Sequence, residues 1–301
     1  MPSRTSRDQK SLGCNAKPYS TKENPMKKHW STIVLVILLI IGLSLLLYPS
    51  VSDYWNLFHQ TRAITDYSEK VAVMDNDKYD EIWNAAYAYN ESLLERENTF
   101  LLNEEQQKTY EELLDISGIG IMGYLEIPVI DVTLPIYHGT AESVLQVGIG
   151  HLDWTSLPVG GPNSHCVVSG HRGLPSARLF TDLDRIVVGD LFMLRVLDEV
   201  LTYEVDQILI VEPQETYALM IEEDKDLCTL VTCTPYGINT HRMLVRGHRV
   251  ENVEEEKVIR VTADAIQIEP VIVAPAVAAP MLLVLLIGLM IPKRKNRRTE
   301  Q

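Results

Sequence analysis

Two uncharged apolar runs, one near each end of the chain, constrain the fold more than any other feature of this sequence. The first run covers residues 31–48 and the second covers residues 271–291. A helix needs about 20 predominantly apolar residues to cross the hydrocarbon core of a bilayer. The sequence therefore predicts two transmembrane helices with a separate domain between them.

The alternatives are a cleaved signal peptide for the first run and a buried core helix for the second. A polar leader of 30 residues precedes the first run, and no Ala-x-Ala-like site follows Tyr48, which favours an anchor. Lys293-Arg294-Lys295 follow the second run almost directly, as in a stop-transfer anchor. Pro275 and Pro280 interrupt its first third, so its regular helix is expected to begin near Pro280.

The charges indicate the orientation of these helices. Residues 1–30 carry seven Lys and Arg against two Asp and Glu, and residues 292–301 carry five against one. Because Lys and Arg mark the cytoplasmic side, we expect both termini to be cytoplasmic and residues 49–270 to lie outside the cell membrane. The whole chain has a formal charge of −14, which argues against non-specific nucleic-acid binding.

The external part changes character at Gly118. Apolar residues recur at three- and four-residue steps between residues 66 and 114, which predicts helices, the second of them capped by Asn103. After Gly118, short β-type runs alternate with Gly, Pro and Asp, which predicts a small antiparallel or mixed β-barrel. The predicted strands are 122–127, 132–137, 164–169, 190–196, 200–211, 227–233 and 242–250.

The predicted organisation combines these segments in order. It comprises a basic cytoplasmic tail (1–30), a transmembrane helix (31–48), a helical N-terminal region (49–117), a β-barrel domain (118–252), an acidic linker (253–270), a second transmembrane helix (271–291) and a basic cytoplasmic tail (292–301).

Three residues at strand ends could act together as a catalytic group. His171 follows one apolar run, Cys233 ends another, and Arg242 opens the last strand. A thiol becomes a nucleophile as the thiolate, and a nearby imidazole promotes that state and can protonate a leaving amine. A guanidinium stabilises the negative charge that develops on oxygen during acyl transfer. Taken singly, each residue is more often structural; together they predict acyl-transfer chemistry.

The segments around these residues resemble the sortases, which are membrane-anchored cysteine transpeptidases of Gram-positive cell surfaces. Residues 232–242, Thr-Cys-Thr-Pro-Tyr-Gly-Ile-Asn-Thr-His-Arg, resemble the active-site segment, and Ser-Gly-His-Arg-Gly at 169–173 resembles the histidine motif. Residues 122–128, 134–139 and 174–180 are similar to class C, the pilus-assembling branch. The resemblance runs from about residue 110 to residue 250, and the second predicted anchor fits this class.

The resemblance implies a mainly β fold, an eight-stranded barrel with N-terminal helices. It implies that Cys233 is the nucleophile, His171 the general acid/base, and Arg242 the group that positions substrate and stabilises the oxyanion. The substrate would be a Leu-Pro-x-Thr-Gly-like sorting signal, cleaved between Thr and Gly through a thioester and transferred to a pilin lysine. No metal or organic cofactor is implied.

Two alternatives stay open. The first is a sortase that attaches surface proteins to the cell-wall peptide with the same residues and a different acceptor amine. The second is a catalytically silent, membrane-tethered scaffold that binds pilins. Hydrolysis by water, as in a cysteine peptidase, is a further side reaction of the same thioester.

One departure from class C concerns the lid. Class C sortases usually carry an Asp-Pro-aromatic triplet that covers the cysteine, and residues 66–120 contain none. Phe100 is the candidate lid residue in the corresponding stretch; alternatively, Phe100 and Leu101 staple two helices together.

Three external cysteines leave at least one free thiol unless the chain pairs with another. Cys166 precedes His171 by five residues and Cys228 precedes Cys233 by five, so the family fold implies that these two thiols lie close together. The odd offset points both away from the catalytic face. We expect two buried thiols, because a disulfide between adjacent strands is strained.

Overall fold

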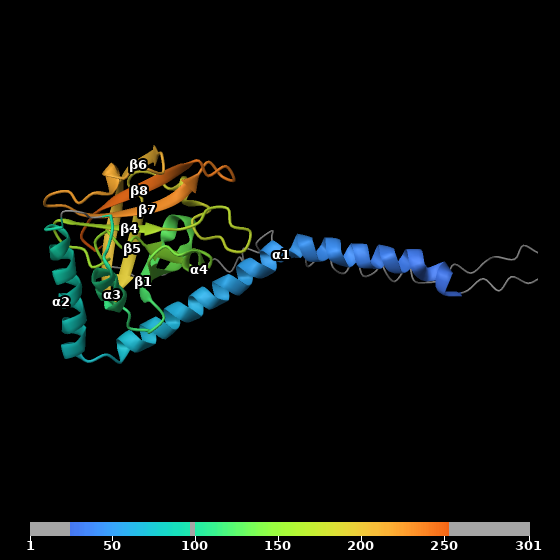
Figure 1. Cartoon of the computed structure of the whole chain (residues 1–301), viewed down its shortest axis with the longest axis horizontal. Helices are drawn as coiled ribbons and strands as arrows, with labels where there is room; N and C mark the ends of the chain where they lie inside the picture. The colour runs from blue at the N-terminus through green and yellow to red at the C-terminus, as the bar shows by residue number, and fades with distance from the viewer. Residues whose placement is uncertain (1–24, 97–99, 253–301) are drawn as a thin grey trace, which may run out of the picture. The chain divides into compact units, whose positions relative to one another are not determined.

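The computed structural model describes residues 25–96 and 100–252, and its centre is a closed β-barrel (Figure 1). The eight strands follow the order β1-β2-β3-β4-β7-β8-β6-β5 around the barrel. They are β1 (Ile121–Ile127), β2 (Val132–His138), β3 (Ile149–His151), β4 (Ser164–Ser169), β5 (Leu191–Val196), β6 (Glu199–Val211), β7 (Asp226–Thr234) and β8 (His241–Arg249).

This architecture confirms the predicted mainly β fold and its eight-stranded barrel. Seven strands match the predicted ranges within one residue at each end, and β3 is the strand that the prediction missed. β4 runs parallel to β7, and β2 runs parallel to β3, while the other neighbouring strands are antiparallel. The mixed pairing brings β4 and β7, which are far apart in sequence, side by side.

The barrel wall has two faces because successive side chains of a strand point to opposite sides. The inner face is filled by one apolar cluster that includes Val168 on β4, Leu230 on β7 and Val245 on β8. A second apolar cluster, which we call the outer cluster, uses the alternate positions of the same strands together with a 3-10 turn, Tyr217–Leu219, between β6 and β7. Its buried members are Val167, Leu219, Val231 and Leu244.

In the part of the chain that the structure describes, four α-helices accompany the barrel: α1 (Pro25–Ala72), α2 (Asn76–Leu93), α3 (Glu104–Glu112) and α4 (Glu142–Leu145). The side chain of Asn103 accepts a hydrogen bond from the amide of Gln106, whose side chain in turn accepts from the Asn103 amide. This reciprocal capping box confirms the predicted start of the second helix. α2 and α3 bury Tyr89 and Tyr110 in a cluster shared with the barrel.

The first predicted membrane helix is part of a longer one. α1 continues through Pro49 to Ala72, so neither Ser31 nor Tyr48 marks a helix end. Within the described residues, one helix, Thr32–Ala72, is long and apolar enough to cross a membrane. From Leu45 onward, α1 belongs to the same compact unit as the barrel. The second apolar run, 271–291, the acidic linker and both basic tails except residues 25–30 lie outside the described residues.

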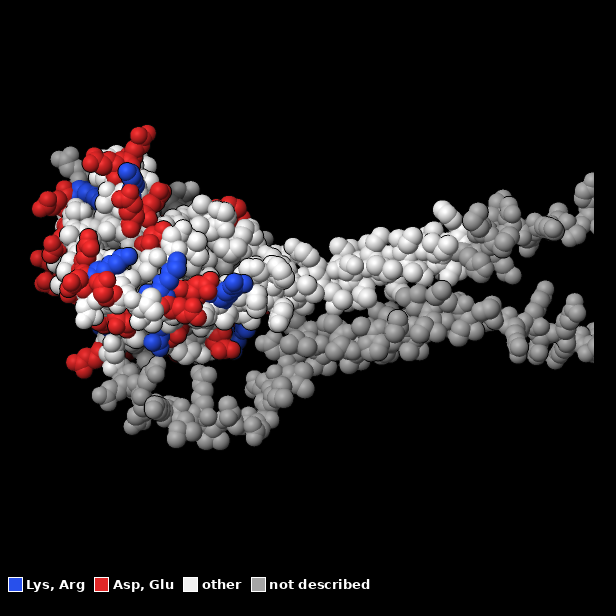
Figure 2. Space-filling model, turned by 90° about the horizontal axis from the view of Figure 1, so that it is seen from below, with Lys and Arg blue, Asp and Glu red and all other residues white. Residues whose placement is uncertain are grey.

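Acidic side chains outnumber basic ones on the face of the barrel unit that Figure 2 presents. Figure 2 shows Asp and Glu spread over the face in view, with Lys and Arg interspersed among them. This distribution follows from the excess of 41 Asp and Glu over 27 Lys and Arg in the chain. A surface of this sign attracts cationic groups and repels polyanions.

Candidate active site

The parallel pairing of β4 and β7 places His171 and Cys233 on neighbouring segments. Beyond the end of β4, the Gly170 amide donates to the carbonyl of Val231 at 3.0 Å. The Thr232 hydroxyl donates to the carbonyl of Gly170 at 2.8 Å. These two contacts extend the pairing past the strand end, and His171 and Cys233 are the residues that follow on each side.

Cys233 and Arg242 are directly opposite partners in the antiparallel pair of β7 and β8. Opposite residues of such a pair share a face of the sheet, with Cβ atoms about 5 Å apart. Both side chains are half-buried. The Arg242 Nη1 atom donates to the carbonyls of Asn239 at 3.3 Å and His241 at 3.1 Å, which holds the guanidinium at the loop between the strands.

The His171 ring faces a carboxylate that sequence reasoning did not identify. The Nε2 atom of His171 lies 3.5 Å from Oε2 of Glu142, at the start of α4. The other carboxylate oxygen of Glu142 accepts a hydrogen bond from the Gln146 amide. That hydrogen bond, together with the nearby imidazole, lowers the pKa of Glu142 below its ordinary value, so the carboxylate facing His171 stays ionised.

A second unpredicted residue, Arg172, ties together the segments that carry His171 and Cys233. Its side chain is only 8% exposed and forms an ion pair with Asp184. Its Nη1 atom donates to the Thr234 hydroxyl at 3.3 Å, and its Nε atom donates to the carbonyl of Thr181 at 3.3 Å. The guanidinium also lies 6.0 Å from the ring centre of Tyr236.

The placement of these partners gives Arg172 a positioning role. Arg172 directly follows His171, and Thr234 directly follows Cys233. Tyr236 packs against Gly173, where an added Cβ would lie 2.8 Å from the ring in a backbone with φ of +74°. The loops after β4 and β7 are therefore fixed against each other beside the two candidate catalytic residues.

The outer cluster lies on the same face of the sheet as Cys233. Val231 precedes Cys233 by two residues on β7, and Leu244 follows Arg242 by two on β8, so all four side chains point outward. Trp154 packs against this cluster from the loop after β3. The candidate nucleophile therefore borders an apolar surface rather than a charged one.

Phe100, the candidate lid residue, lies against this apolar surface. Its ring centre is 4.9 Å from that of Trp154, with the ring planes at 59°. The Phe100 side chain is 45% exposed, and Leu101 is 75% exposed. Phe100 thus contacts the loop after β3.

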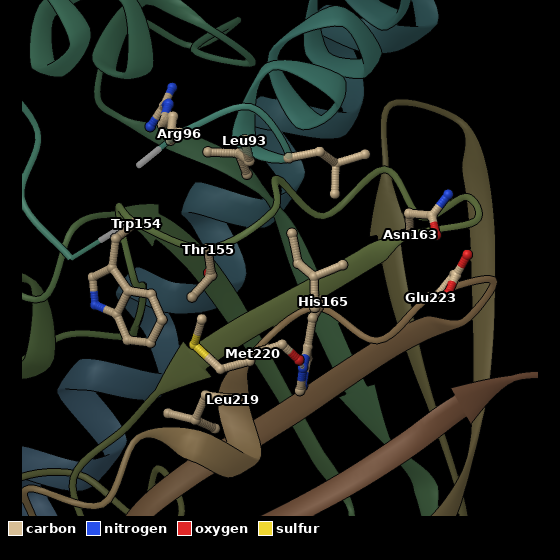
Figure 3. Close-up of a pocket in the computed structure, with 11 residues that line it drawn as sticks. Leu93, Arg96, Trp154, Thr155, Asn163, His165, Leu219, Met220 and Glu223 are labelled. Atoms are coloured by element: carbon tan, nitrogen blue, oxygen red, sulfur yellow. Dashed lines mark hydrogen bonds between the residues drawn. The ribbon is translucent and has the colours of Figure 1, made fainter. Parts of the chain in front are cut away.

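A cavity of about 420 Å³ lies farther along the outer face, and its lining includes Trp154 and Leu219 but none of the three candidate catalytic residues. Figure 3 shows His165 and Met220 on one side of it, with Leu93 and Arg96 from the end of α2 on the other. His165 is fully buried, with its ring nitrogens 2.8 Å from the Met220 carbonyl and 2.7 Å from the Thr229 hydroxyl. Burial lowers its pKa, so His165 is a neutral structural residue.

The other histidines near the motifs also have structural partners. The ring nitrogens of His138 lie 3.0 Å from the Gly120 carbonyl and 2.7 Å from the Leu113 carbonyl, and burial lowers the pKa of His138. His151 is buried and lies 3.0 Å from the Tyr110 hydroxyl. Within residues 25–96 and 100–252, no three His, Cys, Asp or Glu side chains gather as a metal site would require.

Cys166 and Cys228 are opposite partners in the β4–β7 pair, as expected from their spacing. Both are buried free thiols of the inner cluster, on the opposite face of the sheet from Cys233. Burial raises the pKa of Cys228 well above its ordinary value, which keeps it a thiol.

A family model described as the sortase domain matches residues 125–250, which include all three candidate catalytic residues. Sortase D of Bacillus subtilis (strain 168) is 32% identical over 131 residues, which is 42% of this chain. That match spans 63% of the length of Sortase D, so the chain covers less than two thirds of this relative.

Solved structures extend the comparison to a larger share of the chain. Sortase C1 of Streptococcus agalactiae is 50% identical with a TM-score of 0.62, covering 64% of this chain and all of that one. Sortase C of Streptococcus pneumoniae is 45% identical with a TM-score of 0.57, covering 63% of this chain and 96% of that one. Both neighbours are class C sortases.

Proposed function

Because the chain belongs to the sortase family and its structural neighbours are class C sortases, we propose that it is a pilus-assembling cysteine transpeptidase. It cleaves a Leu-Pro-x-Thr-Gly-like sorting signal between Thr and Gly and transfers the new acyl group to a pilin lysine. Cys233 is the nucleophile, His171 the general acid/base, and Arg242 the group that stabilises the oxyanion.

One observation carries this proposal. Cys233 lies opposite Arg242 across β7 and β8, while the hydrogen bonds of Gly170 place His171 on the adjoining segment. This arrangement supports the proposal, because three residue types that acyl transfer requires lie on neighbouring segments from three separate stretches of the chain.

The first half-reaction consumes the sorting signal. The Cys233 thiolate attacks the carbonyl carbon of Thr, and a C–S bond forms while the oxygen takes on negative charge beside Arg242. The C–N bond to Gly then breaks, and the leaving amine takes a proton from the His171 imidazolium. The product is a thioester on Cys233 and a free Gly amine.

The second half-reaction joins the acceptor. An amine attacks the thioester carbonyl and gives its proton to neutral His171, and collapse of the intermediate expels the Cys233 thiolate. Water in place of the amine would hydrolyse the thioester instead. The amine comes from a pilin lysine in this proposal, which the class C neighbours support; the Streptococcus pneumoniae Sortase C structure bears on pilin substrate specificity.

The cellular setting belongs to the same proposal. α1 anchors the chain in the cell membrane, and residues 271–291 supply a second pass, with both termini cytoplasmic and the barrel outside. The apolar composition of Thr32–Ala72 and the Lys and Arg at both ends of the chain support this topology.

The lid role of Phe100 also stays a proposal. Its contact with Trp154 puts an aromatic ring on the apolar surface that borders Cys233. We propose that Phe100 restricts access along that surface, without the acidic partner for Arg242 that class C lids usually supply.

The test uses full-length protein in lipid nanodiscs, a Leu-Pro-x-Thr-Gly peptide and a pilin-derived lysine peptide. Intact mass spectrometry should find an acyl-enzyme on Cys233 and an amide-linked product, and neither with Cys233→Ala. A product formed only with the cell-wall peptide amine would favour the wall-anchoring alternative. No adduct with any peptide, together with pilus assembly that survives Cys233→Ala, would support the scaffold.

A further inference from the structure

The part of α1 that adjoins the barrel has its polar and apolar faces reversed relative to an ordinary surface helix. Asp53, Asn56 and Gln60, spaced three and four residues apart, form one face of the helix. The Asp53 carboxylate accepts from the amide of Arg178 at 2.8 Å. Asn56 donates to the carbonyl of Ser176 at 2.7 Å.

The same polar face makes two more contacts farther along. Gln60 donates to the carbonyl of Val147 at 2.9 Å. Tyr67, exactly two heptads beyond Asp53, is fully buried and donates to the carbonyl of Met122 at 2.9 Å. Polar side chains therefore attach this helix to the barrel unit.

The opposite face of α1 is apolar and exposed. Val51, Tyr54, Trp55 and Phe58 recur at helical spacing and are between 54% and 72% exposed. A large apolar patch of this kind on a protein surface marks a binding surface, because water solvates it poorly. The four side chains stay more than half exposed, and the rings of Trp55 and Phe58 lie beside the ring of His59 on the same helix.

Charge along this face changes in a definite order. Arg62 lies one turn beyond Phe58 on the same face and is exposed. Glu69 follows two turns later, also exposed. The sequence along one stripe is therefore aromatic, then cationic, then acidic, with increasing distance from the membrane-length apolar run of the same helix.

We propose that the exposed stripe of Val51, Tyr54, Trp55 and Phe58 lies in the outer interface of the lipid bilayer. Trp and Tyr concentrate at membrane interfaces, where the ring is apolar and its polar atom reaches water. A cation at the edge of such a stripe meets the anionic headgroups, and acidic groups belong farther out. The stripe from Val51 to Phe58 covers about 10 Å of helix, a length of the same order as the headgroup layer on one side of a bilayer.

The consequence for the enzyme is that its barrel sits directly on the membrane. Ser176 and Arg178 belong to the loop that follows His171, and Val147 follows α4, which carries Glu142. A helix fixed in the interface by one face and bonded to these two segments by the other holds the candidate active site at the bilayer surface. This proposal rests on the membrane anchoring by α1 and is independent of the chemistry of Cys233.

The experiment measures the lipid contact of single tryptophans in the full-length chain, which contains four. Two variants are compared. The first carries Trp30→Phe, Trp83→Phe and Trp154→Phe and therefore retains Trp55 alone. The matched variant retains Trp83 alone, which lies on α2 and packs against the apolar cluster that α2 shares with the barrel. Each is reconstituted in vesicles of phosphatidylcholine and phosphatidylglycerol, with or without acyl chains brominated near the headgroup. We expect bromine to reduce the emission of Trp55 and to leave that of Trp83 unchanged.

A charge placed on the stripe provides the second arm. Phe58→Glu, in the protein with Trp55 alone, should reduce the quenching of Trp55, while Val73→Glu, at an exposed position just beyond the end of α1, should not. Trp55 that is unquenched with emission at long wavelength lies in water, which overturns the proposal. Trp55 that is unquenched with emission at short wavelength is covered by protein, such as a second copy or residues 271–291, which also overturns it. Equal quenching of Trp55 and Trp83 would show that the stripe on α1 contacts lipid no more than α2 does, which would end the proposal.

Discussion

Cys228 and Cys233 lie five residues apart on the same strand, β7, and face opposite sides of the barrel wall. Cys228 is fully buried against Cys166 in the inner cluster, and its pKa is raised by burial. Cys233 is half-buried at the strand end, opposite Arg242. The comparison shows that the face of the sheet to which a cysteine points decides whether its thiol is accessible for reaction. This face alternates from one residue of the strand to the next.

The largest expected effect separates these two thiols. Cys233→Ala should reduce transpeptidation by at least about 10⁴-fold, because the nucleophile is lost. Cys228→Ala should keep most of the activity and lower the free energy of unfolding by about 1–2 kcal/mol, because it leaves a small cavity. Product formation and denaturant titration measure the two effects. Equal loss of activity in both variants would contradict the division into a reactive outer face and an inert inner face.

The next effect tests what holds the outer face together. Arg172→Met should lower kcat/KM by about 100-fold, since small displacements of catalytic groups have effects of that size. It should also lower the free energy of unfolding by about 1–3 kcal/mol, because the buried guanidinium contacts with Thr234 and Asp184 are lost. Arg185→Met changes an exposed arginine nearby and serves as the control. Wild-type kinetics in Arg172→Met would show that the two loops hold their positions without it.

A smaller effect concerns the carboxylate that faces His171. Glu142→Gln should slow alkylation of Cys233 by iodoacetamide several-fold at neutral pH, because the carboxylate that faces His171 is lost and the imidazole is held less firmly on the segment that adjoins Cys233. Gln146 and His171 lower the pKa of Glu142. The contact between the ionised Glu142 carboxylate and His171 is therefore present above the ordinary carboxyl pKa, and it is lost as the pH falls through the lowered value.

The pH dependence of that difference provides the check. Wild type and Glu142→Gln should converge only as the pH falls through the lowered pKa of Glu142, below the ordinary carboxyl value, because Glu142 itself then becomes neutral. Glu112→Gln is the matched control, since its side chain is 69% exposed against 71% for Glu142 and pairs with Lys108 instead. Site-resolved mass spectrometry follows Cys233 and uses Cys166 and Cys228 as buried internal references. Identical rates for wild type and Glu142→Gln at neutral pH would remove Glu142 from the site.

The smallest effect tests the lid. Phe100→Ala removes a ring contact with Trp154, and aromatic pairs contribute about 0.5–1.5 kcal/mol. Labelling of Cys233 should therefore accelerate between about twofold and tenfold, whereas Leu101→Ala, at a more exposed neighbouring position, should change little. An unchanged labelling rate in Phe100→Ala would contradict the lid role and leave Phe100 as a residue that only contacts Trp154 on the surface.

The strands and the three candidate catalytic residues were predictable because their signals are local. Alternating apolar residues and turn residues mark β4, β7 and β8, and the motifs around His171 and Cys233 are long. β3 was missed because its three residues, Ile149–His151, are too short to show alternation. The end of α1 was not predictable from the apolar run. The run predicts the membrane-spanning part of the helix, and Pro49 does not end the helix, which continues to Ala72.

Glu142 and Arg172 escaped prediction for a different reason. Their roles depend on neighbours that are distant in sequence: Glu142 meets His171 from 29 positions away, and Arg172 meets Thr234 from 62 positions away. No periodicity or spacing near Glu142 signals this. Arg172 had a usable signal, since it adjoins the candidate catalytic residue His171 inside the motif.

The hydrogen bonds from Asn56 and Gln60 attach residues 49–72 of α1 to two segments that border the candidate active site. A fragment that contains only the barrel would keep every strand. It would lose the hydrogen bonds from α1 to the loop after His171 and to the segment that follows α4. The kcat/KM of such a fragment should therefore be lower than that of the whole chain. The difference should become smaller when residues 49–72 are restored.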